Sequence, residues 1–564
     1  MLRRRSALIA ASTLVGAIAL TSCNANSRGN ATNSGSASAG GGAAAAPKQG
    51  GTLLEYTSSK EIHFDPAKSQ NLGTSTIHLL ARGLTTWKTS PTGNTELAPD
   101  LATNTGTASD GGKTWTFKLK SGLKYADGGA ITAQDIKFGV ERSFDPQLQG
   151  GLSYHKALLV GGEGYQGPAK GKHLDSIQTP DASTVVFHLN KAFADFPWVA
   201  SMPAFAPIPV GKGMGIPAYD RTPPSSGPYQ VASYTVGSKV TLKRNPNWQK
   251  DTDPVRLGAP DTITYEMGLD PDTLAQRMVD DQGNDKNGAG VQVTSAIVPK
   301  INADPSVKAR TTVSPSGAAE YLILNTSRPG LSNLTVRKAF QYAINKQSLQ
   351  TIAGGPTYGG AISTTLIPPG VQGYQEYDLY KAPATGDTAK AKQLLGGVKL
   401  PTLSLVYDST SPGQAQQAAS IQADLKKLGV NVKLTGQDSD AWQATVSQSN
   451  NFDLTISGWQ ADYPGAYAQL QPVFAASQVG GGNFNLSKFK DPAVDKAIVD
   501  ATALTNADEA AKAWAKIDQQ ILQQAPVVPL YYSHQAYLNG SNVTNTYIPT
   551  FPTYPNVLIQ GLRK

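Results

Sequence analysis

The sequence predicts an α/β protein that is divided into two or three lobes. Its 564 residues are too many for one ordinary hydrophobic core, so we expect lobes of about 100 to 200 residues each. Between residues 401 and 457, apolar strand-like runs alternate with helix-like segments, which is the pattern of a parallel sheet with helical crossovers. The composition, with 39% hydrophobic and 16% charged residues, is that of a folded body.

The predicted elements begin with a short strand after Gly51. Residues 113–120, KTWTFKLK, alternate large apolar side chains with Thr and Lys, as a half-buried strand does. Further on, Thr132 precedes a helix-like run, and Asp135 follows three residues later. This spacing approximates a capping box, so we expect a helix that begins after Thr132.

The clearest pattern lies between residues 401 and 457. The apolar run TLSLVYD is followed by Ser411, Pro412 and Gln414, which predict a helix capped by Ser411. Gly429 ends that helix, and VNVKL, AWQATVSQ and FDLTIS then fit a strand, a helix and a strand. We therefore expect right-handed crossovers and a parallel sheet in this part of the chain.

The segment GWQADYPGAY, residues 458–467, follows the last of these strands. In open α/β sheets, ligands bind at the carboxyl ends of the strands. Asp462 is the one carboxylate in this segment, and it lies between Trp459 and two tyrosines. Two roles stay open for Asp462: it could be the N-cap of a helix that runs through Tyr467 to Phe474, or the countercharge for a bound cation.

The N-terminus has the features of a targeting signal. Residues 1–22 contain three arginines near the start, an apolar stretch and small residues before Cys23, as a secretory signal peptide does. The segment LTSC, residues 20–23, resembles a bacterial lipobox, in which the peptide is cut before a cysteine that then carries a diacylglycerol. We expect Cys23 to be this lipid anchor and residues 23–49 to form a flexible tether; an ordinary secretory signal with an incidental cysteine is the alternative.

Charge and motif patterns argue against nucleic-acid binding and against common catalytic sites. The formal charge of +8 includes the N-terminal arginines, and no basic run follows in the body. The six histidines form no H-E-x-x-H motif, and G-x-S-x-G is absent. No ATP-binding motif G-x-x-x-x-G-K-[ST] is present either. We expect no catalytic residue, no metal site and no cofactor.

Four segments, in order along the chain, resemble the family 5 extracellular solute-binding proteins, the dipeptide and oligopeptide receptors of bacterial ABC importers. The segments are residues 97–143, residues 227–246 with GPY and RNP, residues 322–349, and residues 458–474. The last is similar to the family pattern "gW.aDypDP..fl...f". After RNP, Asn247-Trp248 stands where the family has Tyr-Trp. The resemblance spans nearly the whole mature chain.

The resemblance implies a two-lobed α/β fold of the type II periplasmic-binding-protein kind with an additional domain, three regions in all. The first region would comprise residues 50–80, 206–318 and 526–564, the second residues 81–205, and the third residues 319–525. It also implies that lobes closing about a hinge enclose a peptide or a peptide-like cationic solute. The protein would act as a monomer on the outer face of the cell membrane and would deliver its ligand to an ABC permease with separate ATPase subunits.

The resemblance assigns site residues by position. In peptide-binding members, the aspartate of the last segment pairs with the α-ammonium group of the ligand, and the tryptophan contributes to the pocket. These roles fall on Asp462 and Trp459, and we include Tyr463 among the expected ligand contacts. Core packing is the alternative for Trp459. Gly465-Ala466 departs from the family's Asp-Pro, which leaves the following turn and the outer wall of the pocket open.

The sequence identifies no residue for a ligand carboxylate. Arg337 and Lys338 lie in an amphipathic helix-like stretch, where we expect a structural ion pair instead. Because fold does not fix the ligand, an oligosaccharide, a metal chelate or a secreted metabolite is an alternative solute. A secreted hydrolase acting on peptides or cell-wall material is the alternative of a different class, and it would need a nucleophile and a base, or a metal, in the cleft.

Overall fold

The computed structural model describes residues 47–69, 75–92, 94–148, 151–168, 172–210, 216–294, 296–315, 317–411, 413–480 and 483–563. These residues belong to one unit, Ala44–Lys564. The expected signal peptide, the lipidation site Cys23 and most of the tether lie outside the described residues. Within the described ranges, no helix is both long enough and apolar enough to cross a lipid bilayer.

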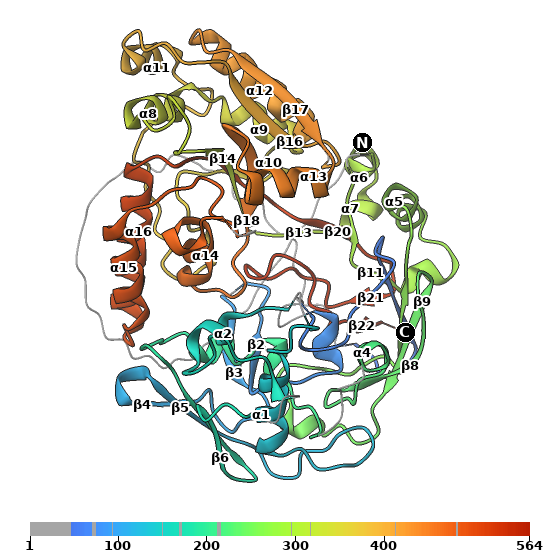
Figure 1. Cartoon of the computed structure of the whole chain (residues 1–564). Helices are drawn as coiled ribbons and strands as arrows, with labels where there is room; N and C mark the ends of the chain where they lie inside the picture. Colours follow the sequence, from blue (N-terminus) through green and yellow to red (C-terminus); the bar gives the residue numbers. More distant parts are fainter. Residues whose placement is uncertain are drawn as a thin grey trace, which may run out of the picture. The chain divides into compact units, whose positions relative to one another are not determined.

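The largest sheet has six strands in the order β15-β19-β14-β18-β16-β17. The strands are β14 (Ala319–Leu324), β15 (Ala361–Ile362), β16 (Leu403–Asp408), β17 (Val432–Gln437), β18 (Leu454–Trp459) and β19 (Val527–Tyr532). β16 is parallel to both β17 and β18, whereas β14 is antiparallel to β18 and β19. The predicted parallel arrangement of residues 401–457 is confirmed, and it forms one half of a mixed sheet (Figure 1).

Both faces of this sheet are buried. Alternate residues of a strand point to opposite faces, and in β14 Leu322 belongs to one hydrophobic core while Tyr321 belongs to another. The core around Leu322 includes residues of α8 (Leu334–Ala343), α9 (Lys346–Ile352), α11 (Thr388–Leu395) and α12 (Gln414–Lys427). The core around Tyr321 includes residues of α14 (Ala466–Phe474), α15 (Pro492–Thr502) and α16 (Ala507–Gln523).

The start of α12 differs from the prediction. Its N-cap is Gly413, which has φ +79° and no capping side chain, so the cap predicted at Ser411 is wrong. The side chain of Gln414 turns back instead and accepts the backbone N–H of Asp408 at 3.2 Å. Glycine adopts this left-handed conformation without the steric cost that a Cβ brings, and this allows the chain to enter the helix two residues later than predicted.

A second group of strands begins with β1, near the start of the described chain. A five-stranded sheet has the order β11-β1-β10-β9-β8, and a three-stranded sheet has the order β12-β20-β13. The strands are β1 (Thr52–Tyr56), β8 (Tyr229–Thr235), β9 (Lys239–Arg244), β10 (Thr262–Glu266), β11 (Gly288–Ala289), β12 (Val291–Gln292), β13 (Thr311–Val313) and β20 (Ala536–Leu538). The helices of this part are α4 (Ile216–Arg221), α5 (Pro271–Asp280), α6 (Val298–Ala303) and α7 (Pro305–Ala309).

Residues 81–205 contain a four-stranded antiparallel sheet in the order β4-β5-β7-β6. Its strands are β4 (Thr107–Ser109), β5 (Thr114–Lys118), β6 (Ile177–Asp181) and β7 (Thr184–His188), and a hairpin of β2 (Thr85–Lys88) and β3 (Glu96–Pro99) lies in the same stretch. The helices are α1 (Ala133–Arg142), α2 (Tyr154–Leu158) and α3 (Phe196–Val199). The capping box predicted at Thr132 and Asp135 is confirmed at the start of α1.

The three expected regions can be compared with the sheets. β19, which the expected division puts in the first region, pairs with β14, which the division puts in the third region. The division as a whole stays a prediction. One continuous hydrophobic core contains residues from both 81–205 and 319–525, so these two stretches pack against each other. The segment GWQADYPGAY contributes to this contact, which places the expected ligand residues at the junction.

Candidate ligand-binding site

Asp462 does not cap the helix that follows it. α14 begins at Ala466, its N-cap is Gly465, and no side chain caps it. A capping side chain has to lie beside the free N–H groups of the first turn, and Asp462 is separated from them by the intervening residues. Its Oδ2 instead accepts a hydrogen bond of 2.5 Å from the hydroxyl group of Tyr154. The N-cap role that the sequence left open for Asp462 is therefore wrong.

The carboxylate of Asp462 is held in a largely buried position without a cation. Burial raises the pKa of Asp462 to about 6, and the hydrogen bond from Tyr154 acts in the opposite direction. Burial and the neighbouring Asp462 carboxylate raise the pKa of Tyr154 far above its usual range, so this phenol remains a donor. Within the described part of the chain, no Lys, Arg or His forms an ion pair with Asp462. An ionised carboxylate in this position favours a positively charged partner.

Tyr463 is completely buried. Its hydroxyl donates a 3.3 Å hydrogen bond to Oδ2 of Asp195, and its ring is nearly parallel to that of Trp198, with 6.4 Å between centroids. The ring also makes an edge-on contact with Tyr154 at 5.9 Å. In this conformation Tyr463 therefore positions Asp195 and Tyr154, and the expected direct contact between Tyr463 and a ligand stays a prediction.

Trp459 has a structural partner as well as an accessible neighbour. Its Nε1–H donates to the carbonyl oxygen of Ala468 in α14 at 2.8 Å. That carbonyl would normally accept from residue 472, but Pro472 has no N–H. The ring lies 4.8 Å from the ring of Phe484, whose side chain is 45% exposed. The indole N–H therefore stabilises the helix, while the Trp459–Phe484 pair presents aromatic surface.

The structure gives a physical reason for the glycine that replaces the family's aspartate. A Cβ at Gly465 would lie 2.4 Å from Cε2 of Tyr463 and 3.0 Å from Oδ2 of Asp195. Real Cβ atoms do not approach other atoms this closely, so the site requires glycine. Asp195, from a different part of the chain, places its carboxylate beside residue 465, the position at which the family motif has an aspartate.

Arg337 lies in α8 and is almost fully buried. Its guanidinium donates to the carbonyl oxygens of Gln524, Leu331 and Ser332 at 2.7–3.1 Å. The structural role predicted for Arg337 is confirmed, but its partners are backbone carbonyls rather than the carboxylate of an ion pair. Such an arrangement ties α8 to the end of α16 and does not present the guanidinium to a ligand.

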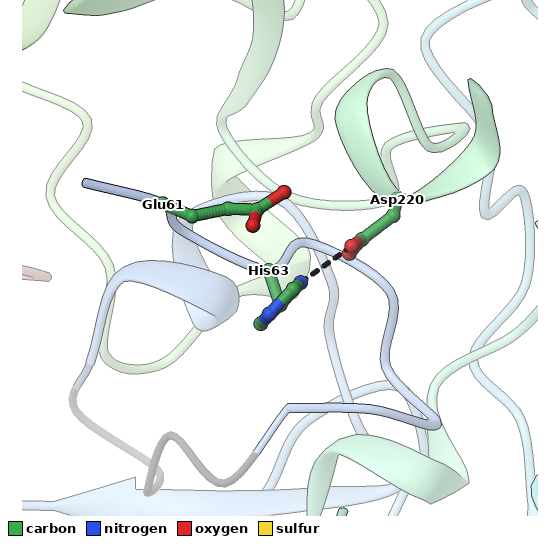
Figure 2. Close-up of side chains that lie close together, drawn as sticks. All are labelled: Glu61, His63 and Asp220. Atoms are coloured by element: carbon green, nitrogen blue, oxygen red, sulfur yellow. Dashed lines mark hydrogen bonds and ion pairs between the residues drawn. The ribbon is translucent and has the colours of Figure 1, made fainter. Parts of the chain in front are cut away.

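Figure 2 shows one group of side chains with metal-ligand chemistry, Glu61, His63 and Asp220, whose ligand atoms lie within 4.8 Å of one another. Asp220 is already engaged: Oδ1 accepts the N–H of Asp65 at 2.9 Å, and Oδ2 lies 2.5 Å from Nδ1 of His63. The ammonium of Lys68 also donates to Oδ2 at 3.4 Å. The group therefore fits a hydrogen-bonded link between α4 and the loop after β1 better than a cation site.

Three side chains of the site come from residues 81–205 and were not predicted from the sequence. Tyr154, Asp195 and Trp198 belong to no motif that the sequence singled out. The stretch DFPW, residues 195–198, combines an acid with aromatic side chains and a proline, as ADYP does at residues 461–464. This shared composition is the one signal that could have suggested that the two segments meet.

A comparison with known protein families identifies the class to which the chain belongs. A model for "Bacterial extracellular solute-binding proteins, family 5 Middle" matches residues 96–481, which is more than half of the chain. The chain is a family 5 extracellular solute-binding protein. Solute binding is thus its function, as the sequence predicted. The family and the relatives described next are binding proteins rather than enzymes.

Named relatives cover most of this solute-binding protein. The probable D,D-dipeptide-binding periplasmic protein DdpA of Escherichia coli K12 is 26% identical over 456 residues, which are 78% of this chain and 80% of DdpA. The glutathione-binding protein GsiB of Salmonella typhimurium is 24% identical over 458 residues, which are 78% of this chain and 82% of GsiB.

The solved structure of "Clavulanic acid biosynthesis oligopeptide binding protein 2" superimposes with a TM-score of 0.84. It is 31% identical, and the match covers 93% of this solute-binding protein and 98% of the other chain. Together with the family match, this likeness confirms the expected α/β fold of the periplasmic-binding-protein type.

Proposed function

We propose that this protein is the extracytoplasmic receptor of an ABC importer and that it captures peptides or peptide-like cationic solutes. The observation that carries the proposal is the carboxylate of Asp462, which is largely buried, bonded to Tyr154 and without a cationic partner among the described residues. DdpA, GsiB and the oligopeptide binding protein are named for dipeptide, glutathione and oligopeptide ligands, which supports a peptide-like solute.

An α-ammonium group would replace solvent at Asp462. Because the pKa of Asp462 is about 6, the carboxylate is mostly ionised at pH 7 and can accept charge-assisted hydrogen bonds. A contact of this kind contributes about 1.5–3 kcal/mol when it is shielded from water. The hydroxyl of Tyr154 keeps the carboxylate oriented while the ligand binds.

The remaining contacts would come from aromatic surface and from closure of the lobes. The half-exposed Trp459–Phe484 pair offers a flat apolar wall for a ligand side chain or backbone. The hydrogen bonds Tyr154–Asp462 and Tyr463–Asp195 join residues 81–205 to residues 319–525. A ligand bound at Asp462 would therefore contact both stretches and favour their association, which is how hinge closure encloses a ligand.

Delivery of the ligand would depend on other proteins and on a membrane anchor. We place the receptor, as a monomer, next to an ABC permease whose ATPase subunits are separate chains. The lipobox-like LTSC segment supports anchoring through a diacylglycerol on Cys23. Labelling cells with a radioactive fatty acid tests this point: the wild-type protein should carry the label, and Cys23→Ser should lose it. Label that persists in Cys23→Ser would contradict the anchor.

Incubation with a defined peptide pool, followed by native mass spectrometry, tests the proposed function. The receptor should retain a subset of intact peptides, and the pool should contain no fragments afterwards. Cleaved peptides would support the secreted hydrolase instead. If no peptide is retained while a saccharide or a metal chelate co-purifies with the protein, the fold would stand and the ligand class would be wrong.

A further inference from the structure

A second carboxylate, that of Asp195, lies at the same junction as Asp462. The two acids come from different stretches of the chain, and a series of contacts joins them. Asp462 accepts from Tyr154 at 2.5 Å, the rings of Tyr154 and Tyr463 meet at 5.9 Å, and Tyr463 donates to Asp195 at 3.3 Å. Asp195 and Asp462 each keep part of their residue surface exposed, while their carboxylates are largely buried.

We propose that Asp195 is a second recognition residue of the ligand site and that it selects ligands whose amino-terminal residue carries an additional positive charge, such as peptides that begin with lysine or arginine. The inference rests on the proposed function, because it assumes that Asp462 receives the α-ammonium group. The side-chain cation of the same ligand residue would then bind Asp195.

The charge environment of Asp195 supports this role. Burial raises the pKa of Asp195 to about 6, and the one hydrogen bond that opposes this rise comes from Tyr463. Lys191, four residues earlier, directs its ammonium over the ring of Tyr467 at 5.9 Å, and within the described residues no ion pair joins Lys191 to Asp195. A carboxylate desolvated without a cation favours a charged group from outside the chain.

The aromatic side chains next to Asp195 suit a long cationic side chain. Trp198 lies three residues after Asp195 and stacks on Tyr463 with 9° between the ring planes. Tyr463 is buried, but Trp198 is partly exposed, and the methylene groups of a lysine or arginine side chain can pack along its ring while the charged end reaches a carboxylate.

The glycine at position 465 makes this geometry possible. Any side chain there would collide with Tyr463 and would approach Oδ2 of Asp195. Gly465 thus allows Asp195 to lie beside the first turn of α14. A purely structural role, in which Asp195 only balances the N-terminal end of the α14 dipole, is the competing explanation. That role would affect all ligands equally, which makes the two explanations separable.

Titration calorimetry with the full-length protein tests the proposal with two peptides, Lys-Ala-Ala-Ala and norleucine-Ala-Ala-Ala. Norleucine keeps the methylene stem of lysine and lacks its charge. The wild-type protein should bind the lysine peptide at least about tenfold more tightly, the worth of one charge-assisted contact. Equal affinity for the two peptides would overturn the proposal and leave the proposed function intact, and failure to bind these two peptides or any peptide of the defined pool would overturn both.

Two variants test whether Asp195 causes the preference for the lysine peptide. Asp195→Asn, which can still accept the hydroxyl of Tyr463, should reduce the lysine-over-norleucine ratio to about one and leave norleucine binding unchanged. Glu163→Gln, which removes an exposed carboxylate from the same stretch of chain, should keep the full ratio. An equal loss for both peptides in Asp195→Asn would show a structural role. If Asp195→Asn does not fold, the wild-type ratio measured at low and at high salt decides, because a charge contact must weaken with salt.

Discussion

At the scale of single residues, the pKa of Asp462 sets a pH range for ligand binding. An α-amino group has a pKa of about 7.7–8.0, and the carboxyl group of Asp462 has a pKa of about 6. Affinity for a peptide with a free amino terminus should therefore be highest between these values, and it should fall below pH 6 as Asp462 takes up a proton. Calorimetric titrations from about pH 5 to pH 9 measure this profile.

The same pH titration of Tyr154→Phe tests whether Asp462 is the group that titrates. The variant removes the hydroxyl that holds the pKa of Asp462 down, so the acidic limb of the profile should move to higher pH. The affinity for an N-acetylated peptide should not fall at acidic pH in either protein. If the pH at which the affinity for the free peptide falls is the same in Tyr154→Phe as in the wild-type protein, a group other than Asp462 titrates.

Asp462 should also reduce the stability of the empty protein. Its folded pKa, about 6, is higher than that of an unfolded aspartate, so the folded state binds the proton more tightly and stability falls as the pH rises from about 4 to 6. Asp462→Asn should raise the free energy of unfolding at pH 7 by roughly 1 kcal/mol, a value reduced for partial exposure. Thermal unfolding at about pH 7 and pH 4 checks this: the gain should be present at neutral pH and absent at acidic pH, and a loss at neutral pH would contradict it.

At the scale of elements, Trp459 of β18 and Pro472 of α14 act as a pair, because the indole N–H of Trp459 takes the place of the N–H that proline lacks. Trp459→Phe should cost about 1–3 kcal/mol because the carbonyl of Ala468 loses its donor. In a Pro472→Ala background, the new N–H at position 472 can satisfy that carbonyl, so the same substitution should cost clearly less. Urea unfolding of the four proteins measures the coupling. An identical cost in both backgrounds would exclude the pairing.

The sequence was informative about elements whose signals are local. The capping box at Thr132 and the alternation in residues 113–120 depend on neighbouring residues, and both appear in the structure as α1 and β5. The cap of α12 was misplaced because Gly413 adopts φ +79°, a conformation that competes with the Ser-Pro pattern next to it. Local patterns cannot decide between two adjacent turn signals when both fit.

Only the part of the site that lies in the GWQADYPGAY motif was predicted from the sequence. Asp462 and Trp459 follow a strand and match a family pattern, whereas Tyr154, Asp195 and Trp198 become neighbours only when distant stretches of chain fold together. The hydrogen bond between Tyr154 and Asp462 joins residues 308 positions apart, and no periodicity encodes such a contact. The same limit applies to Gly465, whose purpose is evident only beside Asp195.

At the scale of the whole molecule, a buried ion pair links α1 to the loop after β1. Arg142 and Asp65 are 1% and 0% exposed, and they form two hydrogen bonds of 2.6 and 2.7 Å. Asp65→Leu or Arg142→Met alone should cost about 3–5 kcal/mol because each leaves a buried charge, and the double variant should recover most of that loss. Chemical unfolding tests this, and a double variant as unstable as the sum of the singles would contradict it.

The central claim is that Asp462 recognises the amino group of a ligand held between residues 81–205 and 319–525. The most direct measurement is the affinity of one retained peptide, with a free and with an N-acetylated amino terminus, for the wild-type protein and for Asp462→Ala. We predict that Asp462→Ala weakens the free peptide roughly tenfold or more and leaves the acetylated peptide unchanged. An equal loss for both peptides, or no loss for either, would contradict the claim.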